Sequence, residues 1–326
     1  MKAFVTGSNG FIGSFLVEKL LKEGYSVRCL VRRTSNIRWL NDLNVELCYG
    51  ELHDPASLHD AVQNIDIVYH LGGVTRGRTE KEYINGNYKA TKNLLNACRR
   101  SGHPEQKFVF VSSQAAGGPS INGEFLTEEG ATLPISMYGR SKLMAERAVL
   151  DFARFRPATI IRPPSVYGPR DKDFYTLFRN ARYGFLPVVG KGRQKISIIY
   201  ISDLVNGLYL AGTQPASNGQ LFFMSSDESV SFSELAGLIL RTMGVRARLL
   251  NIPFGAVKLI VSLSVLASQL TKKTPLINWD KFEEMKQSAW LCSSDKARRL
   301  LDFQAAIGLQ EGIKRTAAWY KENGWL

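Results

Sequence analysis

The amino-acid sequence predicts an α/β fold, in which helices cover both faces of a doubly wound parallel sheet and a smaller lobe follows. Short β-rich runs alternate with helical patterns through the first half of the chain, as expected for parallel strands joined by crossover helices. After Pro163 the alternation weakens, and loops rich in glycine and proline separate shorter elements. We therefore expect residues 1–165 to form the sheet domain and residues 166–326 a smaller lobe, interleaved with it rather than independent.

Each expected element follows from a local pattern. Buried strands are indicated by apolar, β-branched or aromatic runs, and helices by apolar residues at helical spacing that end at glycine or polar residues. The expected strands are Ala3–Gly7, Tyr25–Val31, Val45–Tyr49, Asp66–Leu71, Lys107–Ser113 and Ala158–Pro163. The expected helices are Phe11–Glu23, one that begins at Pro55, Glu80–Arg100 and Tyr138–Arg154.

Composition and charge limit the class of protein. With 44% hydrophobic and 22% charged residues, the chain is neither disordered nor a polytopic membrane protein. The net charge of +13 favours an anionic partner, such as a phosphorylated cofactor, an acidic substrate, nucleic acid or an anionic membrane, although a basic solvated surface would give the same value. We find no dense basic run with interleaved aromatic residues, and therefore expect no nucleic-acid partner.

The cysteines predict no metal site. Cys29, Cys48, Cys98 and Cys292 form no CxxC pair and no Cys/His cluster with zinc spacing, so we expect reduced thiols. Met1 and Lys2 lead directly into the first strand pattern, and we expect no cleaved leader and a cytoplasmic location.

A glycine-rich turn joins the first strand to the first helix. The stretch "TGSNGFIG" (6–13) places glycines where the backbone must turn sharply and where a pyrophosphate could approach the amides at a helix N-terminus. An ordinary turn is the alternative. The residues expected to contact a dinucleotide here are Gly7, Asn9, Gly10, Phe11, Ile12 and Gly13.

The same stretch, TGxxGxxG rather than GxGxxG, resembles the extended branch of the short-chain dehydrogenase/reductase family, which includes NAD(P)-dependent epimerases and dehydratases. The resemblance implies a Rossmann domain that binds a nicotinamide cofactor, followed by a substrate-binding lobe. It covers roughly residues 2–210 with specific motifs and is loose beyond them.

The second strand indicates which nicotinamide cofactor is bound. An acidic residue at its end would bind both ribose hydroxyls of NAD, but the strand ends in "LVRRTS", with Arg32 and Arg33. Because a guanidinium pairs well with a 2′-phosphate, NADP(H) is favoured. The alternative is that both arginines are solvated and that NAD(H) is also accepted.

Further segments resemble cofactor-contacting parts of the family. "YGELHD" resembles the segment at the adenine, with Glu51 where aspartate is usual, and "HLGGVT" resembles the turn below the cofactor. "RPPSVYGPRD" resembles the segment that lines the nicotinamide pocket. Residues assigned to the cofactor by these resemblances are Glu51, Leu52, Leu71, Gly72, Gly73, Pro163 and Val166. His70 lies in a buried strand, and we interpret it as a core histidine with satisfied hydrogen bonds.

The expected catalytic residues are Ser113, Tyr138 and Lys142. In "SMYGRSK" the tyrosine and lysine are at i and i+4, on one face of a helix. A nearby ammonium favours the phenolate and lowers the tyrosine pKa, and the resemblance implies that Lys142 and Tyr138 also contact the cofactor. Ser113, at the end of the fifth strand, would hydrogen-bond the reacting oxygen, and Ser112 is the less favoured choice. Asn87, in a helix motif similar to the family's, is expected to brace its helix against the fifth strand.

The substrate is expected to be relatively apolar. Sugar-nucleotide members of the family carry an arginine that binds the diphosphate, and "GKGRQKIS" has Ile196 at that position. The resemblance is closest to 3β-hydroxysteroid dehydrogenases and dihydroflavonol-type reductases, which implies an NADP(H)-dependent interconversion of a secondary alcohol and a ketone. A nucleotide-sugar epimerase with tightly bound cofactor, and a non-catalytic sensor or assembly factor, are the alternatives. The resemblance also implies a homodimer through the helices of residues 80–100 and 138–154.

One strongly apolar segment, Phe254–Leu270, is shorter than a typical membrane span and contains Lys258. We expect a helix buried in the second lobe or at a subunit contact. Attachment to a membrane surface is the less favoured alternative.

Overall fold

A computed structural model describes residues 1–246, 248–271, 274–275 and 277–326 of the chain. Its centre is a seven-stranded sheet in the order β10-β6-β5-β4-β1-β2-β3, with every neighbouring pair parallel. The strands are β1 (Lys2–Thr6), β2 (Ser26–Val31), β3 (Glu46–Tyr49), β4 (Ile67–His70), β5 (Lys107–Val111), β6 (Ala158–Arg162) and β10 (Leu221–Phe223). The predicted doubly wound parallel sheet is confirmed.

The order of the strands reverses between β1 and β4. From β1 the chain proceeds outward through β2 and β3, and then returns to place β4, β5 and β6 on the other side. In register, Val5 of β1 lies opposite Cys29 of β2 and Tyr69 of β4. Such a reversal opens a crevice at the carboxyl ends of the strands, where open α/β sheets bind their ligands.

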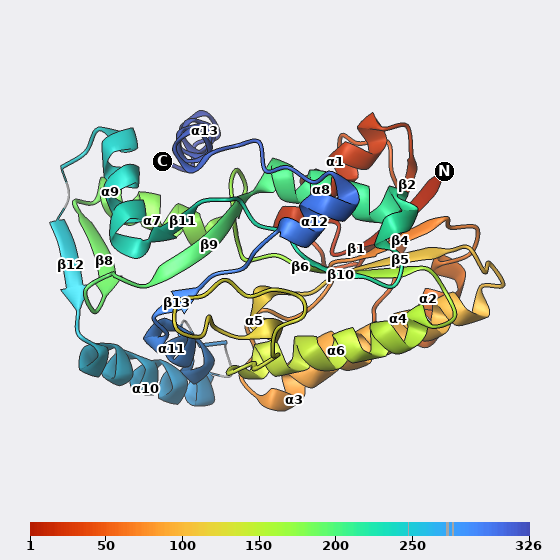
Figure 1. Cartoon of the computed structure of the whole chain (residues 1–326), viewed down its shortest axis with the longest axis horizontal. Coiled ribbons are helices and arrows are strands. Elements are labelled where there is room, and N and C mark those ends of the chain that lie inside the picture. The colour runs from red at the N-terminus through yellow and green to blue at the C-terminus, as the bar shows by residue number, and fades with distance from the viewer. Residues whose placement is uncertain (247, 272–273, 276) are drawn as a thin grey trace.

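Helices cover both faces of this sheet (Figure 1). On one face α1 (Phe11–Lys22) packs beside α8 (Ile201–Thr213), and on the other α4 (Ala90–Arg100) packs between α2 (Pro55–Ala61) and α6 (Met137–Ala153). Each face has its own apolar core, and the strands supply both because their side chains alternate.

The helix predicted over Glu80–Arg100 is divided into three parts. The short α3 (Glu80–Tyr83) continues into a π-helical segment (Ile84–Lys89) and then into α4. The wider turn coincides with close packing: a Cβ on Gly86 would lie 2.3 Å from a methyl of Val74, and the Asn87 amide makes two hydrogen bonds with the Val74 backbone. Tertiary contacts therefore override a regular helical pattern here.

The C-terminal half forms a second lobe and also contributes to the main sheet through β10. In the lobe, β9 (Lys195–Tyr200) pairs with β7 (Ser165–Tyr167), β11 (Ser229–Ser231) and β13 (Ala289–Trp290). A separate pair joins β8 (Phe185–Val189) to β12 (Arg248–Ile252). The other helices of this half are α7 (Lys172–Arg182), α9 (Phe232–Met243), α10 (Phe254–Thr271), α11 (Trp279–Lys286), α12 (Asp295–Leu301) and α13 (Leu309–Glu322).

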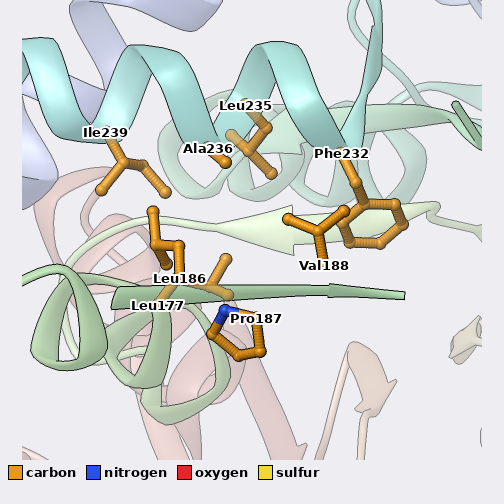
Figure 2. A pocket seen from close by; sticks show the side chains of 8 residues that line it. All are labelled: Leu177, Leu186, Pro187, Val188, Phe232, Leu235, Ala236 and Ile239. Atoms are coloured by element: carbon orange, nitrogen blue, oxygen red, sulfur yellow. The ribbon is translucent and has the colours of Figure 1, made fainter. Parts of the chain in front are cut away.

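Apolar side chains fill the interior of this lobe. Figure 2 shows Leu235 and Ile239 of α9 directed toward Leu186 and Val188 of β8, with Leu177 of α7 beside them. The remaining space of about 10 Å³ holds about one water molecule, so this is core packing rather than a substrate site.

Of the two burial sites predicted for the apolar segment 254–270, the interior of the second lobe is wrong, and a subunit contact stays a prediction. The segment forms α10, of which only 17% is buried, through Val257, Val261 and Ser268. Most of its leucines face outward because the lobe covers one side of the helix only. In the described part of the chain, α10 is the one helix long and apolar enough to cross a membrane, a criterion that helices of soluble proteins can also meet.

Candidate active site

The glycine-rich turn lies at the crevice where the strand order reverses. Gly7 ends β1 with a φ of +68°, and a Cβ there would lie 2.9 Å from the amide nitrogen of Gly72, after β4. Gly13, in the first turns of α1, packs so closely that a Cβ would lie 2.1 Å from the Gly7 carbonyl oxygen. Gly10 is the N-cap of α1, and its amide donates to the Gly7 carbonyl at 3.0 Å.

The amides at the start of α1 can therefore be approached closely, as pyrophosphate binding requires. Phe11 and Ile12 form the first turn of this helix, and the Asn9 side chain donates to the Asn36 carbonyl at 3.2 Å. The residues present fit a dinucleotide, with its diphosphate at this N-terminus.

The residues predicted to surround the adenosine half lie at the same edge of the sheet. Arg32 and Arg33 follow β2 and are exposed, and the Arg33 guanidinium lies 5.4 Å from the centre of the Tyr49 ring. Glu51 is also exposed, whereas a methyl group of Leu52 reaches to 3.0 Å from the position that a Cβ on Gly72 would take. The fold thus brings Leu52 to the turn after β4 and leaves the two arginines exposed to meet an anion.

Tyr138 and Ser113 meet at the other end of the crevice. Ser113 follows β5 and caps the short helix α5 (Gln114–Gly117), where its hydroxyl accepts the Ala115 N–H at 3.2 Å. Burial raises the pKa of Tyr138, near the start of α6, to about 12, and the neighbouring Ser113 hydroxyl opposes the rise. The opposing effect comes from Ser113 and not from Lys142, so the predicted lowering of this pKa by the lysine is not found, and Tyr138 is protonated at neutral pH.

Lys142 is one turn further along α6, on the same face as Tyr138. Its ammonium is buried, donates to the Val111 carbonyl at 2.7 Å and lies 4.6 Å from the centre of the Phe110 ring. Burial lowers the pKa of Lys142 to about 8. The ammonium also lies 3.8 Å from the position of a Cβ on Gly73, so the turn after β4 and the lysine share one end of the site.

A buried ion pair lies beneath these residues. Arg162, at the end of β6, donates to both carboxylate oxygens of Glu146 on α6, at 2.9 and 2.6 Å. Ser112 donates to the same carboxylate at 2.5 Å, so Ser112 is committed to Glu146 while its neighbour Ser113 faces Tyr138. The Glu146 charge raises the pKa of Lys142 against the effect of burial.

Glu146 continues the sequence of i+4 steps that begins at Tyr138 and Lys142. This spacing is the signal that could have found it, but sequence reasoning did not single it out. Arg162 carries no such signal, because only the fold brings the end of β6 to α6.

Two further contacts come from distant parts of the chain. Asp280, at the start of α11, accepts the Tyr138 backbone N–H at 3.2 Å, and burial raises the pKa of this carboxyl. The Tyr83 ring lies 6.2 Å from that of Tyr138, and its hydroxyl accepts from Asn278, next to α11. The second lobe thus holds the N-terminus of α6, which carries Tyr138 and Lys142, a contact that sequence spacing does not reveal.

The other predicted residues occupy the surroundings of the site. The Pro163 carbonyl accepts the Gln114 amide at 2.9 Å, which joins the ends of β5 and β6, and Val166 follows in β7. The side-chain nitrogen of Gln114 is buried and has no hydrogen-bond partner among the described residues. It is therefore a donor next to Ser113 that a polar group of a ligand could satisfy.

Two polar residues of this region are structural. Both ring nitrogens of His70 are hydrogen-bonded, to Thr6 at 2.7 Å and Thr91 at 3.0 Å, and burial lowers its pKa to about 3, as expected for a core histidine. Asn87 bonds the Val74 backbone and the Ser141 hydroxyl. It therefore braces the turn after β4 against α6, and the predicted brace to the fifth strand is wrong.

Together, the reversal of strand order, the glycine turn and the Ser–Tyr–Lys group define the class. The chain is an NAD(P)-binding Rossmann oxidoreductase of the extended short-chain dehydrogenase/reductase type. The model of the NAD dependent epimerase/dehydratase family matches residues 3–222, and the chain belongs to this family.

Several curated relatives are similar over nearly the whole chain. A ceramide reductase from Caulobacter vibrioides is 28% identical over 99% of this chain and 95% of its own length. The decarboxylating sterol-4-alpha-carboxylate 3-dehydrogenase of Mus musculus is 27% identical over 97% of this chain and 90% of its own. Among solved structures, a UDP-glucose 4-epimerase from Thermotoga maritima has a TM-score of 0.83 at 23% identity, covering 99% of both chains. That likeness shows the fold.

The glycine turn gives a testable prediction. Gly13→Ala should weaken binding of the nicotinamide dinucleotide at least tenfold, because the new Cβ cannot fit 2.1 Å from the Gly7 carbonyl without widening the turn. Titration of the protein with cofactor, followed by fluorescence or calorimetry, would measure the change. Gly255→Ala is the matched control, since a Cβ there has no neighbour within 4 Å. Equal affinity of Gly13→Ala and wild type would refute the assignment.

Proposed function

We propose that the protein interconverts a secondary alcohol and a ketone on a relatively apolar small molecule, with NADP(H) as the hydride carrier. The observation that carries the proposal is the position of the buried Lys142, one turn after Tyr138 on α6, with its ammonium 2.7 Å from the Val111 carbonyl at the end of β5, two residues before Ser113. A neutral phenol and a hydroxyl at the end of the same strand suit proton transfer to or from a reacting oxygen.

The substrate class is supported by the residues at the diphosphate position of sugar-nucleotide enzymes. Ile196 is buried in β9, and the Ser197 hydroxyl is occupied by the Cys292 backbone N–H at 3.1 Å. The neighbouring cations Arg193 and Lys195 are exposed. The relatives named as acting on a ceramide and on a sterol carboxylate agree with an apolar substrate. So does a farnesyl-dihydroquinoline-oxide ketoreductase from Stigmatella aurantiaca, 26% identical over 96% of this chain and 95% of its own length.

Each residue has a role in the proposed reaction. The cofactor, when bound, supplies or accepts a hydride at its nicotinamide C4. In the reducing direction Tyr138 gives its proton to the substrate oxygen, and Ser113 holds that oxygen by a hydrogen bond. Lys142 supplies the positive charge that favours the phenolate left on Tyr138. In the oxidising direction the same proton returns to Tyr138.

The choice of cofactor rests on Arg32 and Arg33. Both are exposed at the end of β2, and the structure shows no acidic side chain within that strand or its following turn at residues 32–36. A guanidinium there would pair with a 2′-phosphate, which supports NADP(H) over NAD(H).

We also propose a homodimer through α4 and α6. A surface groove of about 420 Å³ runs between these helices. Its lining includes Lys92, Arg99, Arg147 and Asp151, so a two-fold contact here would be polar rather than a continuous apolar seam.

The function can be tested before the substrate is identified. Purified protein with NADPH or NADP⁺ is incubated in a metabolite extract, and mass spectrometry identifies what changes. We expect a ketone/alcohol pair that differs by two hydrogens, and a loss of about 10²–10⁴-fold in turnover in Tyr138→Phe with cofactor affinity unchanged. Exchange between isomers of one sugar nucleotide would instead establish the epimerase. Full turnover by Tyr138→Phe would remove the proposed mechanism.

The cofactor assignment has its own test. Replacing Arg32 and Arg33 by glutamate should reverse the ratio of kcat/KM for NADPH and NADH by tenfold or more, because each exchange replaces attraction of a 2′-phosphate by repulsion. Arg38→Glu, which changes the same charge beyond the end of β2, is the control. An unchanged ratio in the double variant would show that the arginines are only solvated.

The ion pair beneath the site predicts a shift in the pH profile. Lys142 is charged below its pKa of about 8, so activity that needs the ammonium falls as the pH rises through that value. Glu146→Gln removes a charge that raises this pKa, and we expect the alkaline limb of kcat/KM to move to lower pH by roughly half a unit or more. Ser112→Ala removes a hydrogen bond to Glu146 without changing the charge, so we expect kcat/KM to fall at the same alkaline pH as in wild type. If kcat/KM falls at the same alkaline pH in Glu146→Gln and in wild type, the Glu146 charge does not act on Lys142.

A further inference from the structure

Helix α10 presents two apolar faces, and the protein covers only one of them. Val257, Val261 and Ser268 lie at helical spacing and are buried against the lobe, where the two valines share a small core with Phe282 of α11. Two residues further along the helix, about 200° around its axis, a second face begins. It consists of Leu259, Leu263, Leu266 and Leu270, which are between 54% and 80% exposed.

The exposed face is a continuous stripe. Its four leucines are spaced by four, three and four residues, which places them in one row along the helix. Ile260 and Phe254 add further exposed apolar surface. Figure 1 shows α10 along the lower edge of the molecule, beside α11, with no other element outside it. A contiguous apolar patch on an otherwise polar surface marks an interaction site.

The charge of this part of the chain indicates what covers the stripe. In β12 and α10 the charged residues are Arg248 and Lys258, which are both basic and exposed. The neighbouring α11 carries three acidic residues, but Glu283 and Glu284 pair with lysines of the same helix and Asp280 accepts the Tyr138 backbone N–H. With a net charge of +13 for the whole chain, the stripe is complementary to an anionic surface.

A second copy of the chain fits this segment poorly. A two-fold contact through α10 would bring the same patch of both copies together, and with it two sets of like charges. A helix that crosses a membrane fits poorly as well, because α10 would have to leave its contacts with Phe282 and with Ile277, whose amide donates to Ser264 at 3.4 Å.

We propose that α10 lies in the surface of a membrane that contains anionic lipids, with the leucine stripe among the acyl chains and Lys258 at the headgroups. The proposal rests on the exposed face and its charge, and does not depend on the proposed reaction. A chain of contacts links α10 to the site. The helix α10 packs on α11, and Asp280 of α11 accepts the backbone N–H of Tyr138. The membrane would therefore lie next to the lobe that holds the catalytic helix.

Flotation of the full-length protein with lipid vesicles tests the proposal without any turnover assay. One set of vesicles is phosphatidylcholine, and the other contains about one third phosphatidylglycerol. We expect the protein to float with the anionic vesicles, at least tenfold more than with the neutral ones, and the bound fraction to fall as salt is raised. Binding to neither set, or equal binding to both, would overturn the proposal.

Matched variants locate the contact. Leu263→Gln with Leu266→Gln should reduce binding to anionic vesicles at least tenfold, because both side chains lie in the exposed stripe. Leu133→Gln with Leu300→Gln, two exposed leucines in the loop before α6 and on α12, should bind as wild type does. Circular dichroism would confirm that both variants fold.

The variants also distinguish a second copy of the chain from a membrane. If wild type is an oligomer that the Leu263/Leu266 variant alone converts to monomer on gel filtration, with vesicle binding unchanged, a second copy covers the stripe and the proposal fails. Equal vesicle binding by both double variants would equally place the contact elsewhere.

Discussion

The ion pair between Arg162 and Glu146 is the constraint on which the site depends. It joins the end of a sheet strand to the middle of the catalytic helix, and both side chains are almost fully buried. Removing one partner of such a pair costs about 3–5 kcal/mol, because the other charge remains in an apolar interior. Replacing both by apolar residues is often neutral, so the pair contributes geometry and charge at the site more than net stability.

As a consequence of this ion pair, the neighbouring residues Ser112 and Ser113 have different partners. Because Glu146 accepts from Ser112, the next residue along the chain faces the opposite way, and Ser113 meets Tyr138. The same carboxylate keeps charge on Lys142 in a place where burial disfavours it. Asp280 then holds the first turn of α6 from the second lobe. The catalytic helix is thus positioned from beneath by the sheet and at its end by the lobe.

Local patterns are sufficient for the sheet and for the glycine turn. Six strands and their helices follow from periodicity, and the Tyr138–Lys142 face follows from helix geometry. The rest depends on contacts between distant segments. The three-residue β10 is too short to carry a pattern, and the π-helical segment at 84–89 arises from packing against Val74. The raised pKa of Tyr138 could not be predicted either, because spacing to a lysine does not report how far the phenol is buried.

The same reasoning explains why sequence alone does not place α10. Its apolar residues lie on two faces, beginning at Val257 and at Leu259, so periodicity predicts a helix covered on both sides without saying by what. Only the fold shows that the lobe supplies a partner for one face. Exposing four aligned leucines to water is costly for a monomer in solution. Exposed apolar patches of this kind mark sites of contact with a partner or a membrane. The net charge of +13, with Lys258 as the one charged residue of α10, then favours an anionic surface over a second copy of the chain, because charge acts on the partner rather than on the fold.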